Sequence, residues 1–393
     1  MRISTKTPMG QPLTFRSWLP RVMPGAGRPL TPTLFSGHPD NGESLFPTSL
    51  AASPAHDSTA ASLERIDVTG LLPSQVSDLV DFSRPCILTG IMSTPDCEAW
   101  CDALMEDLGD AEVDFQVRDN HDGRNEVFRS TLADFIHGLQ DESTHDKSWY
   151  LLEEHLLELP QARPELGLSL TVPQNLLGLD EFENFPPAVR PQNLCTIVGG
   201  VGARSFLHCD PMEWMGWNIL LEGRKLWTFL PPSPALDPYL QTYRLAPNAF
   251  GSHNISAGWQ SNVDLYRRGA KRVNGQTCAA WPAVGEGQEV MQHAVAGVQE
   301  QGELVLIPPR YWHQVYHLEP SVAVASQYMD ERVRSRVFKH ILDWCGAKGE
   351  ALPSDFSFLP AKEQTLEVLR VALIARLGEK DGLEAFANLD GPT

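Results

Sequence analysis

Hydrophobic residues begin to follow a regular pattern only after about residue 60. Residues 84–91, RPCILTGI, form a short apolar run that predicts a strand. In the next segment, 93–109, apolar residues recur every four positions, which is typical of a helix with one buried face. The pattern predicts one or two further helices within 129–162.

From about residue 193 the apolar runs become short and are separated by glycine and proline. Four runs lie within 194–232 (LCTIVGG, SFLHCD, WNILLEG and KLWTFLPP), and three lie within 303–329 (ELVLIPP, HQVYHLE and SVAVASQYM). Short strands with turn residues between them predict antiparallel sheets. Beyond 330 the spacing becomes helical again. One face of the last predicted helix holds Leu366, Leu369, Leu373 and Leu377.

These patterns divide the chain into three segments. Residues 1–60 are rich in Pro, Gly, Ser and Thr and predict a disordered tail. Residues 61–330 predict one β-rich domain whose core strands start at about 193, and residues 331–393 predict a helical segment. The stretch 1–39 holds five basic and no acidic side chains, which fits an unstructured tail, with a cleaved organellar transit peptide as the alternative.

Composition and charge narrow the class of protein. The chain is 42% hydrophobic and 21% charged, as in soluble globular proteins, and no apolar run is long enough to predict a membrane span. A formal charge of −19 argues against general nucleic-acid binding, which requires a surplus of Lys and Arg. Seven cysteines without CxxC pairs predict reduced thiols, and hence an intracellular protein in the cytoplasm or nucleus unless the tail directs it to an organelle.

Two polar residues stand out in the apolar run SFLHCD. His208 and Asp210 are two apart, so in a strand they point to the same face. A metal ion would satisfy an imidazole and a carboxylate that are buried together. A second histidine, His313, opens another predicted strand about a hundred residues later. Two histidines and one carboxylate form the facial triad that binds Fe(II) and leaves coordination positions open. Taken singly, His208 could be a core histidine and Asp210 a turn residue.

Two further motifs lie close to these three residues in the sequence. Residues 217–232 contain the cassette WN…GxKxW…PP, and residues 302–313 read GELVLIPPRYWH. With HxD, these motifs resemble the JmjC-type, cupin-fold 2-oxoglutarate oxygenases, and within them the hydroxylase branch, nearest the Jumonji-6 type. The similarity is strongest over 193–232 and 302–329 and does not extend to the first 60 residues. It implies a mainly β double-stranded β-helix (a cupin or jelly-roll fold) with flanking N-terminal helices and a C-terminal helical segment.

The resemblance also implies roles for individual residues. His208, Asp210 and His313 match the catalytic iron ligands, and Lys225 matches the lysine that pairs with the distal carboxylate of 2-oxoglutarate. The remaining matches to cosubstrate-binding positions are Ser205, Asn218 and Gln327. Ser205 replaces a threonine, Gln327 is longer than the usual asparagine, and His317 replaces a smaller polar residue. Each of these residues also has a plain structural interpretation, such as a solvated hairpin lysine or an ordinary hydrogen-bonding side chain.

The implied activity is that of a dioxygenase that uses Fe(II), 2-oxoglutarate and O₂ to hydroxylate a C–H bond, with a protein side chain as the expected substrate. The alternatives are an N-methyl demethylase, a small-molecule hydroxylase and, more distantly, a metal-dependent cupin isomerase or lyase or a non-catalytic binding protein. We expect the segment 233–300 to form a lid and pocket wall; its candidate residues are Tyr239, Tyr243, Trp259, Tyr266, Arg267 and Arg268. The leucine stripe predicts either a homodimer through the C-terminal helices or packing within one chain.

Overall fold

The computed structural model describes residues 61–119, 125–139, 147–170, 176–187, 189–191, 194–233, 240, 243–244, 259–261, 265–266, 271–273, 276–278, 293–347 and 349–389. The predicted tail and the lid candidates Tyr239, Arg267 and Arg268 lie outside these residues. Within the described part, no helix is both long and apolar enough to cross a membrane.

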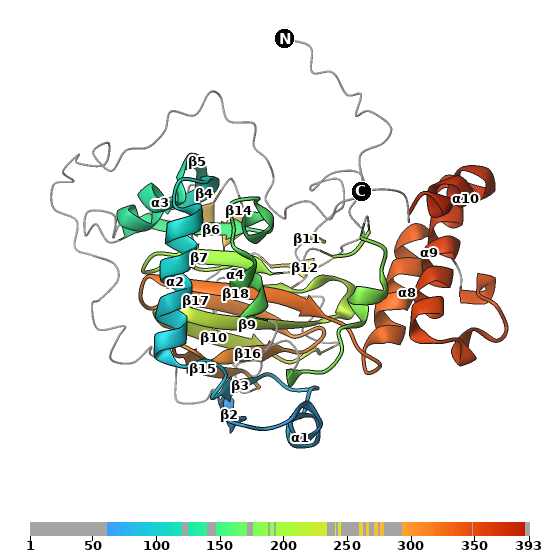
Figure 1. Cartoon of the computed structure of the whole chain (residues 1–393), viewed down its shortest axis with the longest axis horizontal. Coiled ribbons are helices and arrows are strands. Elements are labelled where there is room, and N and C mark those ends of the chain that lie inside the picture. Colours follow the sequence, from blue (N-terminus) through green and yellow to red (C-terminus); the bar gives the residue numbers. More distant parts are fainter. Residues whose placement is uncertain are drawn as a thin grey trace, which may run out of the picture.

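Two sheets make up the centre of the molecule (Figure 1). The larger sheet contains, in spatial order, β2 (Glu64–Asp67), β3 (Cys86–Thr89), β16 (Leu304–Ile307), β9 (Met215–Glu222), β18 (Ser321–Tyr328), β7 (Cys195–Gly199), β6 (Lys147–Glu153), β4 (Glu112–Asp119) and β5 (Asn125–Thr131). The smaller sheet contains β1 (Ala61–Ser62), β15 (Val295–Gln299), β10 (Lys225–Leu230), β17 (Trp312–His317), β8 (His208–Cys209), β12 (Trp259–Gln260) and β11 (Tyr243–Arg244). A separate hairpin pairs β13 (Lys271–Val273) with β14 (Gln276–Cys278).

The two sheets pack face to face through a small apolar cluster. Trp227 and Phe229 from β10 and Val315 from β17 meet Val305 and Ile307 from β16. On β10 these aromatic residues alternate with outward-facing residues, because successive side chains of a strand point to opposite faces. Lys225 therefore points into the same space between the sheets, as the sequence predicted from its spacing to Trp227 and Phe229.

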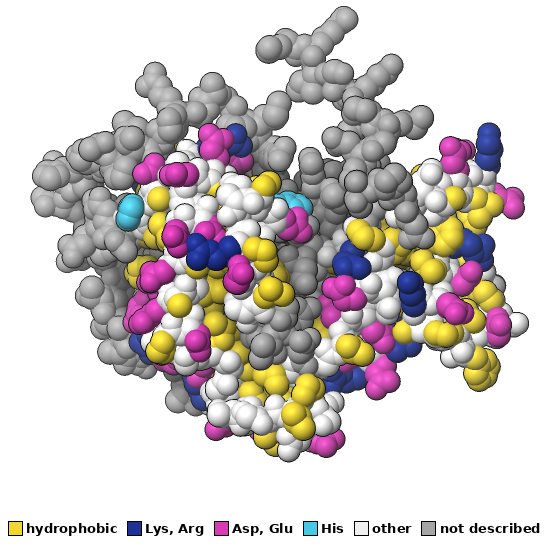
Figure 2. Space-filling model, viewed as in Figure 1, with side chains coloured by type: hydrophobic (Ala, Val, Ile, Leu, Met, Phe, Trp, Pro, Cys, Tyr) yellow, Lys and Arg dark blue, Asp and Glu magenta, His cyan; other side chains and the backbone are white. Residues whose placement is uncertain are grey.

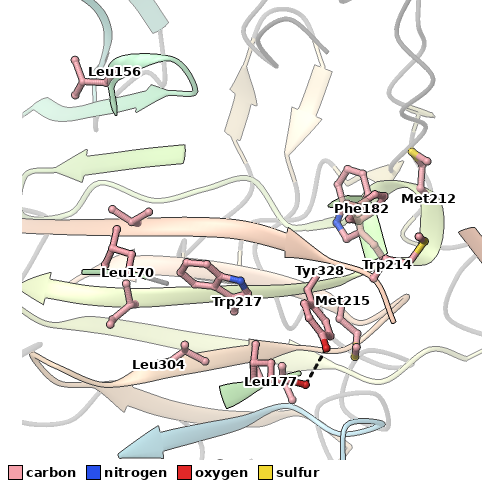
Figure 3. Close-up of a cluster of buried hydrophobic side chains, with 14 of the residues drawn as sticks. Leu156, Leu170, Leu177, Phe182, Met212, Trp214, Met215, Trp217, Leu304 and Tyr328 are labelled. Carbon is pink, nitrogen blue, oxygen red and sulfur yellow. Dashed lines mark hydrogen bonds between the residues drawn. The ribbon is translucent and has the colours of Figure 1, made fainter. Parts of the chain in front are cut away.

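The outer face of the larger sheet is also buried, which explains why its strands read as continuous apolar runs. On β9 every residue except Glu222 is buried. Figure 3 shows Met215 and Trp217 in this outer core, near Tyr328 of β18, whose hydroxyl donates a hydrogen bond to the Leu177 carbonyl at 2.8 Å. This outer core packs against β9 and β18 along their length. The two strands carry the predicted site residues Asn218 and Gln327 on their other face.

Helices cover this face and one end of the sandwich. They are α1 (Pro73–Leu79), α2 (Thr94–Leu108), α3 (Leu132–Leu139), α4 (Pro164–Leu168), α8 (Arg334–Cys345), α9 (Ala361–Leu377) and α10 (Glu379–Ala387). Short 3-10 turns are η4 (Leu156–Glu158), η5 (Glu181–Asn184), η6 (Pro211–Glu213), η8 (Gly349–Ala351) and η9 (Phe356–Phe358). Helix α2 packs on β9 (Figure 1). The Ser93 hydroxyl accepts the Asp96 amide at 3.3 Å as its cap, and the predicted stripe of Trp100, Leu104 and Leu108 is buried.

The region 129–162 differs in part from the expectation. Its described residues contain one α-helix, α3, but also the last three residues of β5 and all of β6, which together with β4 extend the larger sheet. The segment EVDFQVRD of β4 does alternate, with its apolar residues buried and its polar ones at least partly exposed up to Arg118. That two-residue period indicates the strand β4, which lies just before the region 129–162 and pairs with both β5 and β6. As a consequence, the sheet carries side chains toward the site that the sequence analysis did not consider.

The C-terminal helices α8, α9 and α10 lie together at one end of the molecule (Figure 1). Within the leucine stripe only Leu369 is fully buried, at 3% exposure, whereas Leu377 is 48% exposed. Helix α10 folds back onto α9 so closely that a Cβ at Gly382 would lie 2.5 Å from the Ile374 Cα. Packing within one chain therefore accounts for part of the stripe and leaves its C-terminal end exposed.

Candidate metal centre

The three predicted metal ligands meet between the sheets. His208 on β8 is the cross-strand partner of His313 on β17. The Asp210 carboxylate places Oδ1 3.6 Å from His208 Nε2 and 3.8 Å from His313 Nε2. One ligand atom from each residue lies within 4.8 Å of the others. The sequence suggested that Asp210 continues the strand of His208. In the structure the strand ends at Cys209, and Asp210 follows it in extended conformation at the start of η6.

Backbone carbonyls fix the orientation of both imidazoles. His208 Nδ1 donates to the Phe206 carbonyl at 2.7 Å, and His313 Nδ1 donates to the Tyr311 carbonyl at 3.1 Å. Since a carbonyl only accepts, both rings carry a proton on Nδ1 and turn Nε2 toward Asp210. Burial, helped by the nearby His208 ring, lowers the pKa of His313 to about 4 despite the opposing effect of Asp210. His313 is therefore neutral near pH 7, as a metal ligand must be.

The turns beside the ligands adopt unusual backbone conformations. Met212, Glu213 and Arg310 have φ of 58°, 54° and 65°, a left-handed region in which non-glycine residues are uncommon. Each lies within three residues of a predicted ligand. Glu213 and Arg310 approach to 4.0 Å and so link the turn after Asp210 to the turn before His313. Backbone strain of this kind is concentrated at functional sites.

Lys225 lies deeper between the sheets. It is the cross-strand partner of His317 and is only 1% exposed. In the part of the chain that the structure describes, no carboxylate forms an ion pair with it, and burial lowers its pKa to about 7. A buried ammonium group without a counter-charge is costly. Its position therefore calls for an anionic ligand in the same space.

His317, the cross-strand partner of this lysine, lies against Tyr150 of β6 in the larger sheet. His317 Nδ1 lies 2.6 Å from the Ser321 hydroxyl, and burial and then the Lys225 charge lower the pKa of His317 well below its ordinary value. The Tyr150 ring stands perpendicular to the His317 ring, with centroids 5.9 Å apart. A Cβ at Gly199 would lie 2.5 Å from the His317 ring, so the histidine fills space that only glycine leaves open. Tyr150 is a candidate site residue that the sequence analysis missed, because β6 fell in a region expected to be helical.

The three remaining predicted residues also face this space or its border. Ser205 Oγ accepts the Val315 amide at 3.0 Å, which leaves its hydroxyl hydrogen available to a ligand. Asn218 on β9 is 2% exposed, and its side-chain oxygen has no hydrogen-bond partner. Gln327 on β18 pairs with Gly216, where an added Cβ would lie 3.1 Å from Asp210 Oδ2. Gln327 thus lies beside the carboxylate, and the bare Cα of Gly216 leaves room for that carboxylate.

The prediction that Tyr266 belongs to the lid and pocket wall is wrong. The Tyr266 hydroxyl lies within hydrogen-bond distance of the Thr228 hydroxyl at 3.0 Å and of the Gln314 carbonyl at 3.1 Å. Thr228 alternates with the inward-facing Trp227 and Phe229, so Tyr266 covers the outer face of the smaller sheet. The backbone of Trp259 pairs with Cys209, and therefore β12 borders the strand of His208.

The donor set fits a divalent metal and an anionic chelating ligand. Two imidazole nitrogens and a carboxylate oxygen converge, the site retains an unpaired amide oxygen at Asn218, and a buried lysine lies beyond. This combination is that of a two-sheet β-sandwich protein with a candidate 2-His-1-carboxylate metal site.

The comparison with known sequences agrees with that class. Residues 73–332 match the family described as "Cupin-like domain", and the chain belongs to this family. This confirms the predicted cupin-type fold and the predicted resemblance.

Three relatives have names that refer to catalysis. The chain is 26% identical over 254 residues to "Lysine-specific demethylase JMJ21" of Arabidopsis thaliana, covering 64% of this chain and 24% of that protein. It is 23% identical over 271 residues to "Bifunctional arginine demethylase and lysyl-hydroxylase psr-1" of Caenorhabditis elegans, covering 68% and 61%. It is 23% identical over 276 residues to "Arginine-specific demethylase JMJ22" of Arabidopsis thaliana, covering 68% and 47%. In each case the chain spans less than two thirds of the relative.

Proposed function

We propose that this protein is an Fe(II)- and 2-oxoglutarate-dependent dioxygenase that hydroxylates a C–H bond of a protein side chain. Lys225 is the observation that supports this most strongly. The triad alone would serve an isomerase or lyase of the cupin class equally well. Those reactions give a buried lysine no partner, whereas 2-oxoglutarate brings a distal carboxylate that an ammonium group can pair with.

In this proposal each group of residues binds a different part of the metal and cosubstrate. His208, Asp210 and His313 hold the metal, and Lys225, Ser205 and Tyr150 hold the distal carboxylate. Asn218 and Gln327 offer amide groups beside the metal and the keto-acid end. Trp227 and Phe229 keep water out of the space between the sheets, which strengthens the pairing of Lys225 with its ligand.

Bound iron with its keto acid supplies the activation of O₂ that the side chains cannot provide. In the overall balance, one oxygen atom of O₂ enters succinate, CO₂ is released, and the other oxygen enters the substrate C–H bond as a hydroxyl. The protein contributes by holding the reactants in one orientation and by excluding bulk water.

N-methyl demethylation is the second candidate, because relatives are named as arginine and lysine demethylases. Hydroxylation of an N-methyl group would use the same residues and end with release of formaldehyde. A small-molecule substrate is the third possibility. Product analysis separates these outcomes, since a stable hydroxylated residue, formaldehyde and a hydroxylated metabolite are chemically distinct.

We also propose a homodimer formed through the C-terminal helices. Exposed apolar side chains occur there at Phe358, Leu377 and Leu383, with exposures of 87%, 48% and 44%. Figure 2 shows hydrophobic side chains among the charged ones over these helices. A symmetric contact between two copies would cover part of this apolar surface.

The test of the proposed activity is conversion of 2-oxoglutarate to succinate by the full chain with Fe(II) and ascorbate under air, with pooled peptides and metabolites as candidate substrates. We expect succinate release that depends on iron, that a candidate pool stimulates, and that His313→Ala abolishes. An exposed histidine, His293, provides the matched control, and His293→Ala should retain the activity. Absence of iron-dependent succinate with every pool would contradict the proposal.

A further inference from the structure

The turn that carries the candidate metal ligand Asp210 has a strained backbone. Met212 and Glu213, with φ of 58° and 54°, are two consecutive non-glycine residues in the left-handed region. Such conformations persist only where the surrounding structure holds them in place. Within the described turn, the Asp210 side chain caps no backbone amide of η6. The position of this carboxylate therefore depends on what packs against the turn.

Two buried side chains, Met212 and Trp214, anchor the turn in the outer core. The Trp214 ring meets the Phe182 ring of η5 edge to face, with centroids 5.9 Å apart and an interplanar angle of 84°. Figure 3 shows these three side chains close together. Buried aromatic pairs prefer this arrangement over a face-to-face stack. The turn is thus fixed on η5 through the Phe182 ring.

Helix α8 in turn holds η5. Arg334, the first residue of α8, forms a bidentate ion pair with Glu181 of η5, with Nε–Oε2 and Nη2–Oε1 distances of 2.6 and 2.7 Å. Its remaining nitrogen, Nη1, donates to the Gln364 side chain of α9 at 3.3 Å. A planar guanidinium group that binds a carboxylate through two bonds fixes both distance and orientation. One side chain therefore joins η5 to two of the C-terminal helices.

The start of η5 is also tied to the end of β18. The Asp180 carboxylate accepts the amides of Phe182 at 3.0 Å and Met329 at 3.1 Å. The Glu181 amide donates to the Met329 carbonyl at 2.6 Å. Helix α8 packs directly on η6 as well. A continuous set of contacts therefore connects the C-terminal helices to the turn of the metal ligand.

We propose that Arg334 and Glu181 are positioning residues for the metal ligand Asp210, acting through the contact of η5 with the turn. The C-terminal helices are then a structural part of the metal centre. The inference rests on the proposed metal site and deepens it by assigning residues outside the ligand set. His208 and His313 lie on paired strands of the smaller sheet, so loss of the ion pair should disturb one ligand of the three.

The first test is calorimetric titration of the full chain with Mn(II). Arg334→Met should raise the dissociation constant about five- to tenfold, because partners of metal ligands typically contribute 10–100-fold and this pair lies further from the metal. Glu181→Gln should act in the same direction. The double variant should bind no more weakly than the weaker single variant, since both substitutions remove the same interaction. Arg334→Lys keeps the charge without the fork and should bind Mn(II) more tightly than Arg334→Met.

Arg163→Met is the matched control. Arg163, just before α4, forms a similar bidentate pair with Asp107 of α2, with Nε–Oδ2 and Nη2–Oδ1 distances of 2.8 and 2.6 Å. The two pairs are comparably buried, with side-chain exposures of 38% and 10% here against 21% and 15% for Arg334 and Glu181. The control pair joins α2 to α4. Arg163→Met should therefore keep the Mn(II) affinity within about twofold, as expected for an independent site.

Amide hydrogen exchange of the metal-free protein separates positioning from a general loss of stability. In Arg334→Met we expect exchange in residues 212–215 to become about fivefold faster, because local opening of the turn is no longer restrained. Exchange in β17, the strand that carries His313, should stay unchanged. Equal acceleration in both segments would show that the ion pair only stabilises the fold, and would overturn the proposal.

The metal titration gives the remaining outcomes. Unchanged Mn(II) affinity in Arg334→Met, or an equal loss in Arg163→Met, would also overturn the positioning role. If the unaltered chain binds no Mn(II), the proposed metal centre fails, and hydrogen exchange in the metal-free protein decides by itself whether Arg334 holds the turn. If the unaltered chain binds Mn(II) and only the Arg334 and Glu181 variants weaken it, both proposals are supported.

Discussion

Lys225 and His317 are cross-strand neighbours on β10 and β17, and both are about 1% exposed. Burial lowers the pKa of each side chain, and the charge of Lys225 lowers that of His317 further. The pair therefore avoids two positive charges by leaving the histidine neutral. Lys225 is then the one cation of the pair that can bind an anionic ligand. With a pKa of about 7, it is only partly protonated at neutral pH before the ligand binds.

This pair predicts a pH dependence for cosubstrate binding. Lys225 has a pKa of about 7 without ligand, and the 2-oxoglutarate carboxylate pairs with its protonated form. Below pH 7 the affinity should be nearly constant. Above pH 7 binding must take up a proton, so the dissociation constant should rise about tenfold per pH unit. Calorimetric titration of the metal-saturated protein between pH 6 and about 8.5 measures it, and an affinity independent of pH across this range would contradict it.

The same lysine should lower the stability of the ligand-free protein. The folded pKa of about 7 lies below the ordinary value of 10.5, so the unfolded chain binds more protons between these pH values. Stability contributed by this group is therefore lowest below pH 7 and recovers as pH rises toward 10.5. Lys225→Met should raise the unfolding free energy by about 4 kcal/mol at pH 7 and by about 2 kcal/mol at pH 9.

Urea denaturation of the variant and the unaltered chain at both pH values tests this stability prediction. Only the difference between the two proteins is compared, because other groups also titrate. A Lys225→Met variant that is less stable at pH 7 would show that the ammonium group already has a counter-charge in the folded chain.

Gly199→Ala tests the packing around His317. The added Cβ would lie 2.5 Å from the imidazole ring, so His317 must move and disturb its neighbour Lys225. We expect a loss of about 1–3 kcal/mol in unfolding free energy, together with weaker 2-oxoglutarate binding. Gly349→Ala is the control, since an added Cβ there has nothing within 4 Å. Similar behaviour of the two variants would argue against the tight contact.

The dimer proposal is tested at exposed positions of the leucine stripe. Leu377→Asp/Leu383→Asp should run as a monomer in size-exclusion chromatography with light scattering and keep the melting temperature of the unaltered chain. Leu369→Asp should instead lose stability, because Leu369 is only 3% exposed and an aspartate there would be buried. If the unaltered chain is already a monomer at micromolar concentration, the dimer proposal is wrong.

Some features of the site were predictable because they depend on local spacing. The HxD pair and the alternation of Lys225 with Trp227 and Phe229 both follow from the two-residue period of a strand. His313 followed from the Pro-Pro-aromatic turn before its strand. These positions need no knowledge of distant contacts, and the structure brings all of them into one space between the sheets.

Other features depended on contacts between distant segments. Tyr150 reaches His317 only because β6 pairs with β7, with Tyr150 opposite Gly199, and that register is a tertiary property. The need for glycine at position 199 arises from a ring supplied by β17. Tyr266 was misplaced because an aromatic residue in a long connecting segment suits an outer surface as well as a pocket wall.

Calorimetric titration with 2-oxoglutarate tests most directly whether the space between the sheets binds metal and keto acid together. Three samples are compared at pH 6.5, about half a unit below the Lys225 pKa of about 7. These are the Mn(II)-loaded chain, the metal-free chain and Mn(II)-loaded Lys225→Met. We predict binding with one site per chain in the first sample, and a loss of affinity of at least about thirtyfold in each of the others, since removing a buried charge partner costs about 2–5 kcal/mol. Equal affinity in Lys225→Met, or binding that does not depend on the metal, would contradict the assignment of this site.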